Sequence, residues 1–223
     1  AVGSILVGLI TMTGLGLRMS TIILDFSGGY LIVILILTTI MGIILGMGMP
    51  TSGAYIILAS LLAPGLEEAG VELLAAHMFI MYVAAKSSIT PPVAIASYAA
   101  AAIAGTDPWK TSLLAFKLGL SVFIIPYMFV YGPALLGLAP KIEVILVFIT
   151  AVFGIFALSV ACIGWLLDTL SGIERFIAFG SSLLMIQPNW VTDGLGFFIF
   201  CILLFYIQKR PRRHKKNKLM ETA

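Results

Sequence analysis

The sequence predicts an all-α protein that crosses the membrane several times. Of its 223 residues, 61% are hydrophobic and 10% are charged, and the mean hydropathy is +1.13. This composition excludes an ordinary soluble domain. Apolar runs long enough to cross a bilayer recur along the chain and are continuous rather than alternating, which excludes a transmembrane barrel. Two runs are interrupted near their centres by glycine, proline and hydroxyl residues, and paired interruptions of this kind are typical of transporter binding sites.

The first predicted span covers residues 2–17, and residues 18–29, which include Arg18 and Asp25, are expected to be a connector. The chain starts inside this apolar segment, without an initiating Met or a signal peptide. We therefore expect it to be the C-terminal piece of a longer protein.

Residues 30–63 are too long for a single span, and their centre holds the first break, Gly46-Met-Gly-Met-Pro-Thr-Ser-Gly-Ala-Tyr55. Backbone groups within hydrocarbon must be hydrogen-bonded, so a break at that depth survives only when it is buried in protein or lines a cavity. The pattern predicts a re-entrant hairpin whose two ends emerge on the same side.

A polar loop, residues 64–72, carries Glu67, Glu68 and Glu72 and separates the hairpin from the next apolar run. Residues 73–104 are expected to cross the membrane once as a broken helix. The second break lies at its middle and has the sequence Ser87-Ser-Ile-Thr-Pro-Pro92.

Beyond a turn at residues 105–110, residues 111–138 are expected to cross back with a kink near Pro126, and residues 142–167 to cross again. Residues 173–186 are predicted to be either a short span or an interfacial helix. The last span covers residues 191–207.

The basic tail, residues 208–223, predicts a cytoplasmic C-terminus, because Lys and Arg accumulate on that side. Its expected contact is anionic lipid rather than nucleic acid. When residues 173–186 are counted as a span, the acidic loop 64–72 is predicted to lie on the outer side of the membrane.

Each break joins the end of one helix to the start of another. The free carbonyls near Gly46 carry partial negative charge, and the free N–H groups after Pro50 carry partial positive charge. At the second break, Thr90 is expected to cap the following helix, with Pro91 or Pro92 at its first position. Carbonyl and hydroxyl oxygens suit Na⁺, and helix N-termini suit a carboxylate. This pairing indicates a cation-coupled carrier of organic acids, although either break alone is equally consistent with a packing kink.

Six motifs in and around the breaks follow a recognisable pattern: Gly46–Tyr55, Ala63-Pro64, Ala76-His-Met-Phe79, Ser88-Ile-Thr-Pro-Pro-Val-Ala94, Tyr98–Ala101 and Ile125-Pro-Tyr-Met-Phe-Val-Tyr131. With these motifs the sequence resembles a known family, the large permease subunit of tripartite ATP-independent periplasmic (TRAP) transporters. The similarity is greatest to the fused permeases that work with TAXI-class binding proteins. It covers most of residues 1–137, and residues 138–207 are similar to the extra transmembrane helices of fused permeases.

The resemblance implies an elevator transporter of the inner membrane, built from two inverted repeats, of which this chain holds the second. It implies that the hairpin tip and the facing break together form one Na⁺ site and half of a substrate site, with no cofactor beyond the coupling ion. The expected partners are a periplasmic TAXI-type solute-binding protein, the N-terminal repeat and the small-subunit helices. The expected Na⁺ ligands are Gly46, Gly48, Pro50, Ser52, Ser87, Ser88 and Thr90. The expected substrate contacts are Thr51, Ser52, Gly53, Lys86, Thr90 and Pro91.

Lys86 departs from the family pattern, in which an apolar or small residue is expected. An unpaired ammonium near the bilayer centre is costly, so it should face a cavity or a partner unless the side chain snorkels to the surface. We expect Lys86 to supply positive charge beside the second break, either to the substrate or in place of a coupling ion.

Two other functions compete with transport. An intramembrane serine hydrolase would need a pairing such as Ser52 with His77, but the expected glycine two residues before the serine is replaced by Pro50. His77 is more simply explained as a hydrogen-bonded packing residue. A channel could use the hydroxyl-lined breaks as a filter, but no repeated ring motif is present in the sequence.

Overall fold

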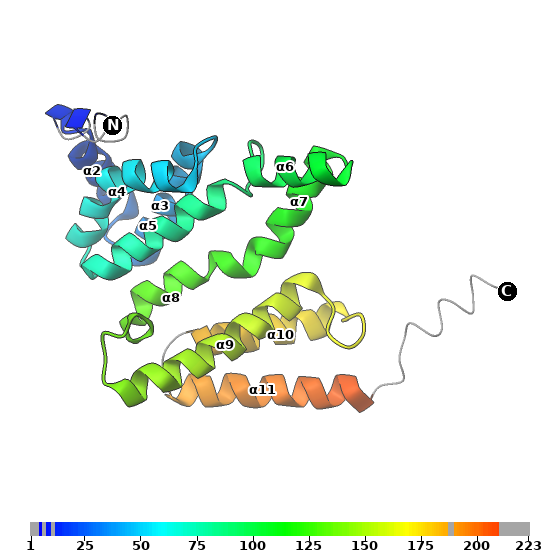
Figure 1. Cartoon of the computed structure of the whole chain (residues 1–223). Coiled ribbons are helices and arrows are strands. Elements are labelled where there is room, and N and C mark those ends of the chain that lie inside the picture. Colours follow the sequence, from blue (N-terminus) through cyan, green and yellow to red (C-terminus); the bar gives the residue numbers. More distant parts are fainter. Residues whose placement is uncertain (1–4, 6–7, 10–11, 187–189, 210–223) are drawn as a thin grey trace. The chain divides into compact units, whose positions relative to one another are not determined.

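The computed structural model describes residues 5, 8–9, 12–186 and 190–209. Within that part of the chain the regular elements are all helical, apart from one isolated β-bridge between Trp165 and Thr169. The prediction of an all-α protein is therefore confirmed. The chain divides into two compact units, Ala1–Leu136 and Gly137–Ala223 (Figure 1).

The first unit is built around four helices that share one apolar core. These are α2 (Leu15–Ser27), α3 (Leu31–Gly46), α4 (Thr51–Glu68) and α5 (Leu73–Ser87). The core between them includes the fully buried side chains Leu35, Leu58, Leu62, Phe79 and Ile80. The unit continues with α6 (Ile95–Ala104), α7 (Pro108–Gly119), the 3₁₀ turn η1 (Leu120–Phe123), α8 (Ile125–Tyr131) and a second 3₁₀ turn, η2 (Pro133–Leu136).

The second unit is a group of three helices, α9 (Lys141–Ile163), α10 (Gly172–Ile186) and α11 (Trp190–Lys209). Helix α10 contacts both of the others. Ser171 and Glu174 form a reciprocal cap at its start, and Arg175 donates hydrogen bonds to the carbonyls of Ala161 and Cys162 at the end of α9. Residues 172–186 form a 15-residue helix that packs against both α9 and α11, and the two predicted alternatives, a short span or an interfacial helix, stay predictions.

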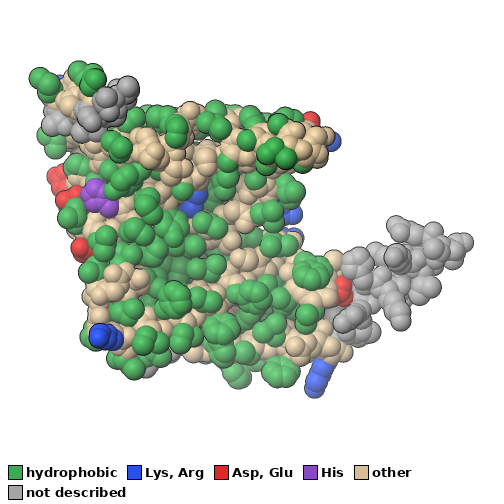
Figure 2. All heavy atoms as spheres, viewed as in Figure 1, with side chains coloured by type: hydrophobic (Ala, Val, Ile, Leu, Met, Phe, Trp, Pro, Cys, Tyr) green, Lys and Arg blue, Asp and Glu red, His purple; other side chains and the backbone are tan. Residues whose placement is uncertain are grey.

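Three helical segments of the described chain are long and apolar enough to cross a membrane: Pro108–Tyr131, Lys141–Ile163 and Val191–Lys209. Many large hydrophobic side chains on the helix surfaces are exposed, such as Ile103, Phe148 and Phe198. Figure 2 shows hydrophobic side chains spread over the visible face, while charged groups are few. This surface fits a polytopic membrane protein, as predicted.

Two element predictions were wrong. Residues 18–29 are not a connector, because most of them belong to α2, whose buried stripe of Gly16, Ser20, Ile23 and Ser27 has helical spacing. Residues 64–72 are not all loop either, because α4 continues through Pro64 to Glu68. The hairpin arms therefore extend past residue 63, and Glu67 and Glu68 lie in the last turn of a helix.

Helix α4 tolerates Pro64 because α2 packs beside it. A proline lacks the N–H that would bond the carbonyl four residues earlier, here that of Ser60. That carbonyl faces Gly16 of α2 so closely that a Cβ on Gly16 would lie 2.7 Å from its oxygen. The close approach allows a Cα–H···O contact with the carbonyl that the proline leaves free.

The turn at residues 187–189 and the tail from residue 210 lie outside the described residues. Residues 208 and 209, which were predicted to belong to the tail, are still part of α11.

Candidate functional site

The two breaks are brought together because α3 and α5 run side by side in the same direction. A Cβ on Gly42 would lie 2.5 Å from Val83 Cγ1, and a Cβ on Gly46, one turn later, would lie 2.9 Å from Ser87 Oγ. Both contacts advance by four residues along each helix, so the two helices are parallel and their C-termini end at the same level. Only glycine at these two positions of α3 permits an approach this close.

A hydrogen bond joins the breaks at this point. The Ser87 hydroxyl, which is buried, lies 3.0 Å from the Gly46 carbonyl oxygen and 2.7 Å from that of Ala84. One of these carbonyls belongs to the hairpin and the other to α5, and 41 residues separate Ser87 from Gly46. Ser87, for which the family resemblance implies a role as an ion ligand, thus joins the first break to the second.

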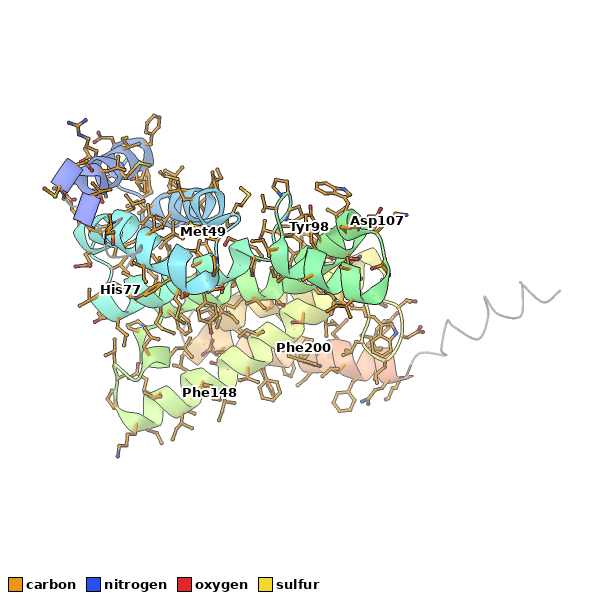
Figure 3. The ribbon with its side chains drawn as sticks, turned by 45° about the horizontal axis from the view of Figure 1, so that its top comes forward. Met49, His77, Tyr98, Asp107, Phe148 and Phe200 are labelled. Carbon is orange, nitrogen blue, oxygen red and sulfur yellow. The ribbon has the colours of Figure 1, made fainter. Side chains whose placement is uncertain are left out.

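The first break spans residues 47–50 and makes a tight reversal. Met47 and Pro50 are extended, and Gly48 has a φ of +81°, a conformation that favours glycine. A Cβ on Gly48 would lie 3.8 Å from Val93 Cγ1, so the reversal faces the second break. Figure 3 labels Met49 in this reversal.

Helix α4 begins at Thr51 without a side-chain cap, because the preceding residue is Pro50. Thr51 and Ser52 are exposed, and Gly53 is half-buried. The first N–H groups of a helix have no partner within it. The start of α4 therefore presents open donors together with two hydroxyl groups, as an anion or a polar ligand requires.

The second break spans residues 88–94 and differs in detail from the prediction. Thr90 does not cap the following helix; its hydroxyl donates to the Lys86 carbonyl at 2.8 Å. Helix α6 begins at Ile95, with Ala94 as its N-cap, so neither Pro91 nor Pro92 occupies the first helical position. A hydroxyl four residues after a carbonyl on a helical turn reaches back to it easily, and this local bond prevails over capping.

Several residues of the second break were missed by sequence reasoning. The Tyr98 hydroxyl donates to the Pro92 carbonyl, and Ala96 N–H donates to the Ser88 carbonyl at 3.0 Å. Ala94 is fully buried and has a φ of +27°, which is strained for a residue with a Cβ. Figure 3 labels Tyr98 on α6. Only the position of Tyr98, one helical turn beyond the break, could have indicated this contact.

Lys86 lies in the last turn of α5 with only 3% of its surface exposed. Its Nζ atom is 4.6 Å from the centre of the Phe123 ring and 5.8 Å from that of Tyr82. Within the part of the chain that the structure describes, no carboxylate pairs with it. The side chain therefore does not snorkel to the surface; it is held between aromatic faces.

His77 hydrogen-bonds Tyr55, with 3.0 Å between Nδ1 and the phenolic oxygen. This bond ties α5 to α4 and agrees with the predicted packing role. Among the described residues, no hydrogen bond joins His77 to Ser52, and no group of three or more His, Cys, Asp or Glu side chains is arranged to hold a metal. The arrangement offers no support for a serine–histidine hydrolase.

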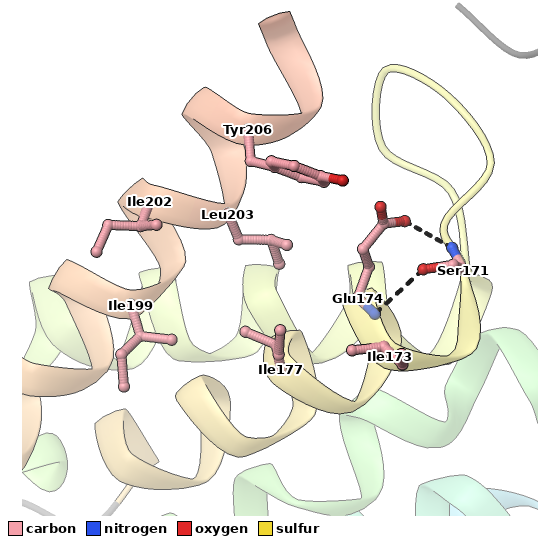
Figure 4. Close-up of a pocket in the computed structure, with 8 residues that line it drawn as sticks. All are labelled: Ser171, Ile173, Glu174, Ile177, Ile199, Ile202, Leu203 and Tyr206. Carbon is pink, nitrogen blue, oxygen red and sulfur yellow. Dashed lines mark hydrogen bonds between the residues drawn. The ribbon is translucent and has the colours of Figure 1, made fainter. Parts of the chain in front are cut away.

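A separate groove of about 580 Å³ lies in the second unit, between α10 and α11 (Figure 4). Its walls are mostly apolar, and Figure 4 shows the Ser171–Glu174 cap and Tyr206 at one end. None of the predicted site residues lines this groove. Its size alone therefore does not make it the functional site.

The structure thus groups the site residues of the first unit into one region with two kinds of helix end. The C-termini of α3 and α5 meet at Gly46 and Ser87, and the start of α4 follows the first break. Carbonyl and hydroxyl oxygens suit a hard cation, and the open N–H groups suit a carboxylate. Broken-helix transporters use these two kinds of helix end to bind a coupling ion and an anionic substrate.

Comparison with protein families gives a match over residues 1–144 to the tripartite ATP-independent periplasmic transporter, DctM component. This range includes both breaks and all the predicted site residues. Comparison with curated proteins and with solved structures gave no match.

Proposed function

Because the chain belongs to the DctM family, the large permease component of TRAP transporters, we propose that it takes up an organic acid in symport with a cation, Na⁺ in the first instance. Membership of the family makes the chain a multi-pass inner-membrane transporter component, which works with a periplasmic binding protein and a small membrane subunit. The nature of the substrate, the sodium coupling and the elevator movement are parts of the proposal.

The observation that carries this proposal is the meeting of the two breaks at the Gly46–Ser87 hydrogen bond. Two helix C-termini at one level create a region of negative potential that attracts a cation. The uncapped start of α4 lies directly after the first break and attracts a carboxylate. In broken-helix transporters these two kinds of helix end bind the coupling ion and an anionic substrate.

The finer assignment follows the family resemblance. Residues 1–137 form the second inverted repeat, with α3 and α4, residues 31–68, as the re-entrant hairpin and residues 73–104 as the broken helix. Residues 138–207 are additional helices of a fused permease, and its binding protein is of the TAXI type. The hydroxyls of Ser52, Ser87, Ser88 and Thr90 and the carbonyls of the breaks hold the ion. Thr51, Ser52, Gly53, Lys86, Thr90 and Pro91 contribute to the substrate half-site.

Uptake by the intact transporter in proteoliposomes tests this function. Radiolabelled succinate and glutamate serve as probes, with and without the purified binding protein, under an inward Na⁺ gradient or a matched K⁺ gradient. We expect uptake that saturates, requires the binding protein and is driven by the Na⁺ gradient. Uptake that rises linearly with probe concentration without the binding protein would indicate a channel instead.

The proposed topology places the C-terminal tail in the cytoplasm and the Glu67–Glu72 region in the periplasm. Single cysteines at Glu68 and Lys216, introduced in a background without Cys162 and Cys201, are exposed to an impermeant thiol reagent in intact cells. The Glu68→Cys site is expected to be labelled from outside, and the Lys216→Cys site only after the cells are opened. Labelling of Lys216→Cys in intact cells would reverse the orientation.

A further inference from the structure

The C-terminal ends of α3 and α5 form one electrostatic feature of the first unit. Gly46 ends α3 and Ser87 ends α5, and the hydrogen bond between them fixes the two ends beside each other. Each end carries a partial negative charge, and the two charges reinforce one another in a low-dielectric surrounding. Such a place favours a positive charge nearby.

Lys86 brings a cation into this part of the first unit. Its backbone is in the final turn of α5, directly before Ser87, and its side chain is buried. The Nζ atom lies over the ring of Phe123 in η1. Gly119, just before η1, lies against the break, because a Cβ there would be 2.9 Å from Ile89 Cδ1. The ammonium is thus held between Tyr82 of α5 and Phe123 of η1, and the residue before η1 approaches the second break.

The surroundings of Lys86 hold the ammonium without cancelling its charge. Aromatic faces attract a cation through their quadrupole but carry no net charge. The acidic residues described in the first unit are all exposed, and two of them are engaged in capping: Glu72 accepts from Ala75 N–H and Asp107 accepts from Lys110 N–H. When Lys86 is protonated, no carboxylate of the described residues neutralises its charge, which then acts on an ion bound nearby.

We propose that Lys86 is a tethered cation that competes electrostatically with sodium at the junction of the two breaks and so sets a low sodium affinity in this repeat. The inference rests on the proposed function and adds a determinant of its ion coupling. A fixed ammonium beside the Gly46 and Ser87 ends supplies part of the positive charge that a sodium ion would bring. Repulsion between the two cations weakens sodium binding, and removal of the ammonium removes that repulsion.

Sodium binding to the purified intact transporter in nanodiscs, without any substrate, tests whether Lys86 lowers the sodium affinity. Thermal unfolding is followed while NaCl replaces N-methyl-D-glucamine chloride at constant ionic strength. Bound sodium should raise the melting temperature of the transporter. For Lys86→Met, which keeps the length of the side chain, we expect the sodium concentration that gives half of this rise to be about tenfold or more lower than for the wild type. Lys86→Arg keeps the charge, and Lys117→Met removes an exposed ammonium of the same unit. Both should keep the wild-type midpoint.

The sodium midpoints and the folding of the Lys86 variants decide whether Lys86 competes with sodium. The same sodium midpoint in Lys86→Met and in the wild type, or no sodium response in either, overturns the proposal. If Lys86→Met folds only in sodium, the proposal is supported, because sodium then replaces the ammonium. If neither Lys86→Met nor Lys86→Gln folds in either salt, sodium cannot replace it, and the proposal fails.

Uptake with and without the binding protein is measured on the same preparations. Equal midpoints with intact binding-protein-dependent uptake refute only the role of Lys86. Loss of that dependence in the wild type refutes the proposed function itself.

Discussion

Gly46→Ala should abolish uptake and lower the stability of the transporter. The new Cβ would lie 2.9 Å from Ser87 Oγ and 3.1 Å from Ser87 Cβ, so α3 and α5 must separate to accommodate it. Overpacking of this kind costs about 1–3 kcal/mol. Separation would also break the bond between Ser87 and the Gly46 carbonyl and displace the oxygen ligands of the proposed ion site. Thermal unfolding and uptake in proteoliposomes measure the two effects.

A double-mutant cycle identifies the cause. Ser87→Gly removes both atoms that the new methyl group would strike, so Gly46→Ala should be much less destabilising in the Ser87→Gly background. Gly180→Ala is the matched control, because no atom lies within 4 Å of a Cβ at that helical position. Additive effects of Gly46→Ala and Ser87→Gly on the melting temperature would show that the two residues are not in contact.

Ser52→Ala and Thr90→Ala should each raise the sodium concentration required for half-maximal uptake by roughly tenfold or more. Each removes one hydroxyl oxygen at the junction, and a hydrogen-bonding partner of a charged group contributes about 1.5–3 kcal/mol. The amount of protein in the membrane should not change. The sodium dependence of initial uptake rates, measured at a fixed concentration of loaded binding protein, gives the midpoint.

Thr21→Ala is the control for Thr90→Ala. Its hydroxyl bonds the Leu17 carbonyl four residues earlier at 2.9 Å, as Thr90 bonds the Lys86 carbonyl, but it lies exposed on α2. Any effect of losing such a local bond is therefore shared by both variants, whereas a change in sodium midpoint should occur only in Thr90→Ala.

A wild-type midpoint in both Ser52→Ala and Thr90→Ala would remove these hydroxyls from the ion site. Lys86→Met is expected to shift the midpoint in the opposite direction.

The positions of the two breaks were predictable because glycine, proline and hydroxyl residues are conspicuous within apolar runs. The helical state of residues 18–27 was not, because Arg18 and Asp25 make the segment polar while its buried stripe consists largely of small residues. Small residues give little hydrophobic periodicity, although they allow close helix packing. The continuation of α4 beyond Pro64 depends on Gly16, which lies far away in the sequence.

The residues of the candidate site were also predictable only in part. The sequence predicted that Lys86 would face a cavity or a partner unless its side chain reached the surface, and the structure buries the side chain against aromatic rings. The aromatic partner Phe123 was not predictable, because it lies 37 residues further along the chain, on a 3₁₀ turn that interrupts a long apolar run. Thr90 was predicted to cap the following helix, but its hydroxyl bonds the Lys86 carbonyl of the preceding one. The sequence does not distinguish a threonine that caps the next helix from one that bonds back to the previous helix.

The distance along the chain between Gly46 and Ser87 affects biogenesis. The hairpin leaves the ribosome before α5 exists, and its reversal at residues 47–50 then lacks the hydroxyl that joins it to the rest of the unit. Hydrocarbon does not tolerate exposed backbone polar groups, so a re-entrant tip of the proposed kind should not reach its final depth alone. We therefore expect membrane insertion of the hairpin to be completed late, after synthesis has passed the second break. Until then we expect the nascent hairpin to stay at the interface or within the protein-lined space of the insertion machinery.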